Sequence, residues 1–268
     1  PSIFARLGCI QFDTINVVGR NADLVLQSRV ENYQPEILEK LLYQDRVLID
    51  GWDKVASIYA TDDWPFFERH RNRMREQLHR RSPNASEVTT KVLKKIEANG
   101  HSSSLDFKDS TKTDWAWGPT SITRAALEIL YAEGKLGIHH RVNTRRHFDL
   151  IERLIPSDLL QAPDPNPTDE QYQEWHVLRR IGGLGIASNK SGEHWLGIYG
   201  ARKVSERKSV IQRLVEKNLV AQLVIDGIQP QTFYIRTEDV PKLSDLPQPP
   251  KPTNAAFLAP LDNLLWNR

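Results

Sequence analysis

The chain has 268 residues, a length that fits about two domains of ordinary size or three small ones. Its 39% hydrophobic and 26% charged residues are typical of a globular protein and exclude a chain that is disordered throughout. No apolar run approaches the roughly 18 residues of a membrane span, no signal peptide opens the chain, and the single cysteine, Cys9, excludes a disulfide framework. These features indicate a reducing, cytoplasmic location without a membrane partner.

The net charge of +2 conceals three basic zones. Residues 69–95 carry nine Lys and Arg against two Glu, and residues 201–217 carry six against two acids. Residues 135–147 carry four Lys and Arg and three His, with no acid. The rest of the chain is therefore acidic. Such an asymmetry is typical of proteins that bind polyanions, although three solvated helix or hairpin surfaces would give the same pattern.

One order of elements recurs three times along the chain. An amphipathic helix ends at a polar residue or a glycine, and a short apolar strand follows at once. The three junctions lie roughly 85 to 90 residues apart, which is the size of a small domain. The first copy is the least complete: a strand is expected over residues 9–18, and helices over about 21–31 and 35–44.

A polar pair lies within the first predicted strand. Because side chains alternate on a strand, Gln11 and Asp13 would share one face, about 7 Å apart, and Phe12 would point the other way. An amide and a carboxylate at that separation can hold a water molecule between them. The same pattern also fits the ordinary polar face of a strand.

The second copy is the clearest. Helices are expected over residues 84–99 and from Pro119 to Gly134, because apolar residues recur at helical spacing and a glycine ends each helix. Strands over 135–142 and 145–150 would then form a hairpin. Helix, short strand, helix and hairpin is the order of a winged helix-turn-helix.

The predicted hairpin carries a basic cluster. Guanidinium groups on a hairpin are well placed to lie along a groove and bind phosphates, although a solvated hairpin would carry them too. The candidate DNA-binding residues are His139, His140, Arg141, Arg145 and Arg146. The adjacent histidines do not predict a metal site, because no carboxylate or cysteine stands at ligand spacing. No metal and no cofactor is expected.

The third copy repeats the order of the second. Helices are expected over residues 169–186 and 206–217, with a short one over 192–200 between them. Strands over 219–225 and 231–236 follow, and proline-rich stretches flank the copy. The predicted fold is therefore α+β and helix-rich, with three tandem winged helix-turn-helix modules. Their expected ranges are 1–82, 83–160 and 161–245, with 246–268 a linker into a further, β-rich portion.

Several stretches resemble the AlkZ/YcaQ-like bacterial DNA glycosylases. The longest runs from Leu7 to Val18 and continues through Arg20 to Arg29, and another runs from Ala259 to Arg268. Shorter matches are Trp52 with Ala56-Ser57, Trp115-Ala116-Trp117, and Phe148 through Pro156. The two tryptophans of the middle match are expected in the core rather than stacked on bases. The resemblance covers essentially the whole chain.

The resemblance implies three tandem winged helices that cup duplex DNA. It implies excision of alkylated purines, above all N7-alkylguanine, and in some members the unhooking of interstrand crosslinks. The family's catalytic motif corresponds to Gln11-Phe12-Asp13, in the form with Asp that is more typical of the YcaQ branch. Asp13 would stabilise the oxocarbenium-like sugar and activate water, and Gln11 would position that water. Arg20 and Arg29 would join the hairpin in binding DNA.

The expected partner is double-stranded DNA with alkylated purines or crosslinks, bound by a monomer associated with the nucleoid. Some positions depart from the family, whose members usually carry His in the segment matching residues 20–23 and at Lys54, and an aromatic residue at Gln27. Segments that family members carry before residue 1 and after Arg268 suggest that the chain is a fragment. The alternative is a non-catalytic winged-helix regulator, which would not depend on Asp13. A protein-interaction scaffold, a third alternative, would lack the steep salt dependence of phosphate binding.

Overall fold

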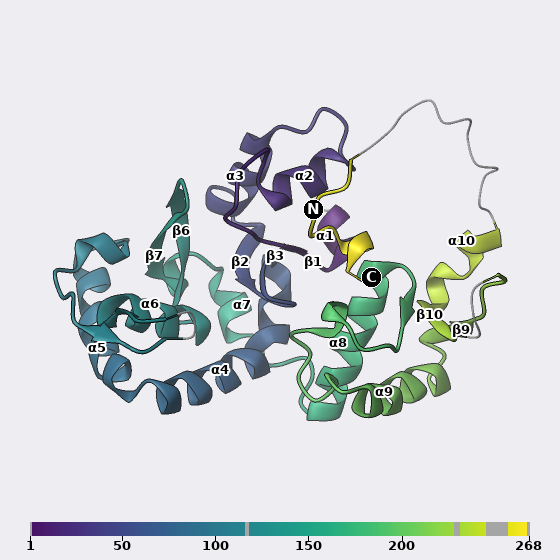
Figure 1. Cartoon of the computed structure of the whole chain (residues 1–268). Helices are drawn as coiled ribbons and strands as arrows, with labels where there is room; N and C mark the ends of the chain where they lie inside the picture. The colour runs from purple at the N-terminus through teal and green to yellow at the C-terminus, as the bar shows by residue number, and fades with distance from the viewer. Residues whose placement is uncertain (1, 116–117, 228–230, 245–256, 267–268) are drawn as a thin grey trace. The chain divides into compact units, whose positions relative to one another are not determined.

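The computed structural model describes residues 2–115, 118–227, 231–244 and 257–266 (Figure 1). The architecture is α+β and helix-rich with small antiparallel sheets, as predicted. The chain divides into two compact units. The first unit comprises residues 1–38, 52–60 and 166–268, and the second comprises 39–51 and 61–165.

The N-terminal part of the first unit is built on a short antiparallel strand pair. β1 (Cys9–Gln11) pairs with β3 (Ala56–Ala60), with Cys9 opposite Tyr59 and Gln11 opposite Ser57. Helices α1 (Ser2–Leu7) and α2 (Asn21–Gln27) flank β1 in sequence.

The prediction of a strand over residues 9–18 is wrong beyond Gln11, where β1 ends. The last main-chain bond to the neighbouring strand runs from the N–H of Phe12 to the oxygen of Ala56, at 2.9 Å. The carboxylate of Asp13 then accepts the N–H of Ile15 at 2.9 Å, which turns the chain away from the sheet. Strand alternation therefore does not set the direction of the Asp13 side chain.

The C-terminal part of the first unit begins with the long helix α8 (Asp169–Leu184), which starts at a capping box formed by Thr168 and Gln171. Helix α9 (Val204–Glu216) follows, and the strands form a sheet of order β8-β10-β9. The remaining bounds are β8 (Ala187–Ser188), β9 (Val220–Leu223), β10 (Phe233–Arg236) and α10 (Pro241–Ser244). The helices predicted over 169–186 and 206–217 are confirmed, whereas residues 192–200 hold only a 3₁₀ turn at Glu193–Trp195.

The second unit packs helices beside a hairpin. The strands β6 (Leu136–Val142) and β7 (Arg145–Leu150) confirm the predicted hairpin. The other elements are α4 (Glu68–Arg81), α5 (Pro83–Asn99), β4 (Lys112–Thr113), β5 (Thr120–Ser121), α6 (Ile122–Ala132) and α7 (Ser157–Gln161). Helix α3 (Pro35–Tyr43) and strand β2 (Leu48–Trp52) each carry the chain from one unit into the other.

The core of the second unit confirms the predicted helical faces. Ser121 caps α6 by accepting the N–H of Arg124, and Gly134 follows the helix at a φ of +79°. The buried side chains of one cluster come from α5 and α6, and Trp115 packs against them; they are Ala85, Ile122, Ala125 and Ile129. Trp115 is thus partly buried against the core, in the direction of the prediction, while Trp117 lies outside the described residues.

The order of elements within each unit matches the predicted repeat. The second unit contains α5, α6 and the β6–β7 hairpin, and the first contains α8, α9 and the β9–β10 pair. The division into three winged-helix modules stays a prediction. Within the described part of the chain, no helix is both long and apolar enough to cross a membrane.

Candidate active site

Gln11 is fixed at both its main chain and its side chain. Its main-chain oxygen accepts a hydrogen bond from Nδ2 of the buried Asn21, at 2.8 Å. Its side-chain Oε1 accepts one from Nζ of Lys54, at 3.0 Å. The carbonyl end of the amide is therefore committed to Lys54, and the NH₂ end is the one that can donate to a substrate or a water molecule.

Lys54 is buried, with only 5% of its surface exposed, which is unusual for a lysine. Its Nζ lies 4.9 Å from the ring centroid of Trp266 and 3.9 Å from Oε2 of the exposed Glu193. A buried ammonium group is costly unless polar groups or an aromatic ring surround it. The contacts with Gln11, Trp266 and Glu193 therefore stabilise the charge of Lys54 at this position. Lys54 is one of the positions at which the sequence was expected to depart from the family it resembles, and in the structure its ammonium group is the donor to Gln11.

A buried carboxylate holds the loop that carries Lys54. Asp53 accepts hydrogen bonds from Nε2 of His176 at 2.9 Å, from Arg180 at 2.7 Å and from Nε of Arg179 at 3.1 Å. Burial favours protonation of this carboxyl, yet His176 and the arginines outweigh it and hold the pKa of Asp53 well below its usual range. Arg179 also donates to the main-chain oxygen of Gly8 at 2.6 Å. Helix α8 therefore fixes both the Lys54 loop and the start of β1.

Two glycines permit this close packing. Gly197 has a φ of +81°, and a Cβ there would overlap the main-chain oxygen of Asp53. A Cβ on Gly183 of α8 would likewise overlap the main-chain oxygen of Leu7. Both positions require glycine, because main-chain atoms cannot move aside as a flexible side chain can.

The C-terminal segment 257–266 lies beside the N-terminal elements of the first unit and contacts them directly (Figure 1). The carboxylate of Asp262 accepts hydrogen bonds from the two terminal guanidinium nitrogens of Arg29, each at 2.6 Å. Asn263 donates to the main-chain oxygen of Cys9 at 3.0 Å, and the N–H of Leu261 donates to Asn21 at 3.2 Å. The two longest stretches that resemble the glycosylase family thus contact each other.

Asp13 lies on a loop with an apolar tip. The residue is half-buried, and its carboxylate accepts the N–H of Ile15. The side chains that follow are strongly exposed: Ile15 by 66%, Val17 by 86% and Val18 by 85%. Three exposed apolar side chains on one short loop form an apolar surface of the kind that is typical of binding sites.

Most of the predicted DNA-binding arginines are in ion pairs. Arg20 contacts Asp23 at 2.5 Å, and Arg29 is held by Asp262 as described above. Each guanidinium group is held by a carboxylate, so both arginines stabilise the first unit. Their role in DNA binding stays a prediction.

The predicted hairpin cluster divides in the same way. The side chain of Arg141 is only 7% exposed and pairs with Asp50 at 3.0 Å, and Arg146 pairs with Glu128. Arg145 is exposed at the end of the hairpin. Of the predicted basic residues on the hairpin, Arg145 is therefore the one most open to a phosphate.

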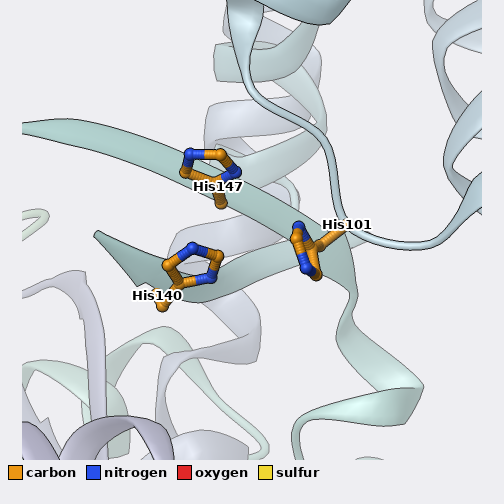
Figure 2. Close-up of side chains that lie close together, drawn as sticks. All are labelled: His101, His140 and His147. Atoms are coloured by element: carbon orange, nitrogen blue, oxygen red, sulfur yellow. The ribbon is translucent and has the colours of Figure 1, made fainter. Parts of the chain in front are cut away.

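The hairpin histidines belong to a larger cluster that sequence reasoning missed. The rings of His140 and His147 stack with centroids 4.4 Å apart, and that of His101 lies 4.9 Å from His140 and 5.6 Å from His147 (Figure 2). His139 contacts His140 through Nδ1 atoms 2.8 Å apart. Burial, together with the neighbouring histidines, lowers the pKa of His140 to about 4, and burial also lowers the pKa of His139 and of His147. His101 is 38 residues upstream of His139, and no short-range spacing in the sequence signals its approach.

Comparison with known proteins identifies the protein family. A family model described as "DNA glycosylase AlkZ-like" matches residues 4–268, so the chain belongs to the AlkZ-like DNA glycosylase family. This confirms the resemblance noted in the sequence. The solved structure of Streptomyces sahachiroi DNA glycosylase AlkZ has a similar fold, with a TM-score of 0.56 and 14% sequence identity, over 92% of this chain and 67% of that one. Membership of the family implies a hydrolase that acts on DNA.

Proposed function

We propose that the chain is a monofunctional DNA glycosylase that hydrolyses the N-glycosidic bond of N7-alkylated purines in duplex DNA. The observation that carries the proposal is the hydrogen bond from Lys54 to Oε1 of Gln11, which orients an amide two residues before Asp13. A polar face of a strand with no chemical task would not need a buried lysine behind it. Gln11 and Asp13 are therefore assigned as the catalytic pair.

The chemistry follows from the charge of the lesion. Alkylation at N7 makes the purine cationic, so the base leaves with the electron pair of the C1′–N9 bond and becomes neutral without an acid. What remains is an oxocarbenium-like sugar that must be stabilised and attacked by water. The carboxylate of Asp13 stabilises that positive charge and accepts the proton of the attacking water. The NH₂ group of Gln11 donates to the water and holds it at C1′. The products are the free base and an abasic site.

The exposed loop beside Asp13 fits this substrate. Apolar side chains that reach a base step can separate it and hold the duplex open near the reacting sugar. Ile15, Val17 and Val18 are placed on such a loop and are exposed enough to enter a groove. An open site of this kind also suits crosslinked purines, which cannot be flipped fully into a closed pocket. Crosslink unhooking is therefore part of the proposal.

Base release tests the proposed function. Duplex DNA with a single N7-methylguanine is incubated with the wild-type chain, and both the free base and the abasic strand are measured. Release without strand cleavage supports a monofunctional glycosylase. Salt-sensitive DNA binding with no release of base from any N7-alkylated substrate would instead favour the non-catalytic regulator.

A further inference from the structure

We propose that His101, His140 and His147 form a binding site for one divalent transition-metal ion of the zinc class, at the β6–β7 hairpin of the second unit (Figure 2). One nitrogen from each imidazole ring lies within 4.8 Å of the others. Among the described residues, this is the one group of three or more His, Cys, Asp or Glu side chains with that geometry. The proposal does not rest on the proposed function, because it concerns neither Gln11 nor Asp13.

The backbone brings the three histidines together. His140 and His147 are directly opposite each other in the antiparallel register of β6 and β7. A bulge between Ile138 and His140 interrupts that register. A bulge inserts one extra residue and re-aims the side chains beside it, so the adjacent His139 and His140 lie ring to ring instead of on opposite faces.

His101 reaches the hairpin through a main-chain bridge. The next residue, Ser102, exchanges two hydrogen bonds with Phe148, from N–H to oxygen at 2.9 Å and 2.8 Å. Phe148 directly follows His147. The bridge therefore sets the ring of His101 beside those of His140 and His147 and holds the loop after α5 against β7.

The donor set suits a borderline metal ion. Three neutral imidazoles are ligands for Zn²⁺, Cu²⁺, Ni²⁺ or Co²⁺, whereas Mg²⁺ and Ca²⁺ prefer oxygen. Tetrahedral Zn²⁺ with Zn–N bonds of about 2.0–2.1 Å holds its nitrogens about 3.4 Å apart, so small rotations of the rings close the observed triangle. Water would fill the fourth position, as in sites with three protein ligands.

His139 has a supporting role in this arrangement. When Nδ1–H of His140 donates to Nδ1 of His139, the lone pair on Nε2 of His140 is free for the metal. A metal-binding histidine commonly donates its other ring N–H to a neighbour, which fixes its tautomer.

The surroundings argue against an anion at the same place. Neutral imidazoles supply no net charge to a phosphate. The guanidinium group of Arg46 donates to the main-chain oxygens of Ile138 and His139, at 3.0 Å and 2.9 Å. Arg146 is paired with Glu128. These two arginines are committed to other groups, and the exposed Arg145 stands at the end of the hairpin, opposite Val142. The lone pairs of the rings are therefore the groups that face a ligand held between the three histidines.

Metal titration tests the site. The chelator-treated full chain is titrated with Zn²⁺ by calorimetry and with Co²⁺ by visible absorption, in the absence of DNA. The expected result is one ion per chain and the intense visible bands of tetrahedral Co²⁺. His101→Gln, an exposed loop substitution that spares the core, weakens binding on the order of 100-fold, and His139→Gln weakens it by about 10-fold.

His79→Gln is the matched control, since His79 belongs to the same unit but pairs with Glu133 on α6's C-terminal side. It should bind metal as the wild type does. The proposal is overturned if the wild type binds no ion saturably, or if His101→Gln binds as tightly as wild type. It is also overturned if His79→Gln causes the same loss as His101→Gln.

Discussion

Nζ of Lys54 lies 3.0 Å from Oε1 of Gln11, and this bond links a buried lysine of the first unit to the side chain of the proposed catalytic Gln11. Lys54→Met keeps much of the side-chain volume but removes the donor. We expect base release to slow by about 10- to 100-fold, because a small misplacement of a reacting group costs that much. Single-turnover kinetics measures the effect.

A double-mutant cycle separates positioning from a loss of stability. If Lys54 acts through Gln11, then Lys54→Met slows release in the wild type but has little further effect in a Gln11→Ala background. Equal slowing in both backgrounds would contradict the positioning role. Urea unfolding of all four proteins shows whether they are folded under the assay conditions.

Gly197 makes the loop of Asp53 and Lys54 possible, and Gly185 provides a matched control. Both have a positive φ, but a Cβ on Gly185 meets nothing within 4 Å. Gly185→Ala should lower the free energy of unfolding by about 1–2 kcal/mol through backbone strain alone. Gly197→Ala should add about 1–3 kcal/mol for the overlap with Asp53 and should also slow base release. Equal losses of stability in the two variants would contradict the close-approach argument.

Substitution of Arg145 should affect DNA binding, whereas substitution of Arg141 should affect the stability of the fold. Arg145→Ala is expected to reduce the slope of log affinity against log salt by about 1, with stability unchanged, because it removes one exposed phosphate contact. Arg141→Ala should instead lower the free energy of unfolding by about 3 kcal/mol, because Asp50 stays buried without its guanidinium partner. Fluorescence anisotropy at several salt concentrations and urea unfolding measure both. A salt slope unchanged by Arg145→Ala would remove this residue from the DNA contact.

Acid should destabilise the chain through its histidines. Burial lowers the pKa of His139, His140, His147, His176 and His194 in the folded state. Below pH 6.5 the unfolded chain therefore binds more protons than the folded chain, so the stability present above that pH is lost as the pH falls. Urea unfolding at pH 7.5, 6 and 5, with chelator present, should show a steady decline. Constant stability between pH 7.5 and 5 would contradict these pKa directions.

Local patterns in the sequence predict the helices and the hairpin well. The apolar spacing from Ile122 to Leu130 and the glycine at 134 define α6, and the two strands of the hairpin match their predicted ranges. Such features depend on residues close in sequence. The strand at 9–18 fails for a local reason too, because the Asx turn at Asp13 competes with the strand.

The site itself depends on contacts between distant residues. Gln11 and Asp13 stand out only through the family resemblance, whereas the role of Lys54 depends on a loop fixed by Asp53 and helix α8, over 120 residues away. His101 likewise joins the hairpin through a single main-chain bridge. Partly buried ion pairs also engage Arg29 and Arg141, so these residues are not part of the free basic surface. A count of charges along the chain does not show which cations have a partner.

The most direct measurement of the central claim is single-turnover release of N7-methylguanine by the wild type, Asp13→Asn and Glu31→Gln. Glu31 is exposed in the same unit and lies outside the site, so its variant controls for the loss of one negative charge. The account predicts that Asp13→Asn binds the duplex as tightly as wild type but releases base at least about 100-fold more slowly, while Glu31→Gln matches wild type. Undiminished release by Asp13→Asn would contradict the assignment of Asp13 as the catalytic carboxylate.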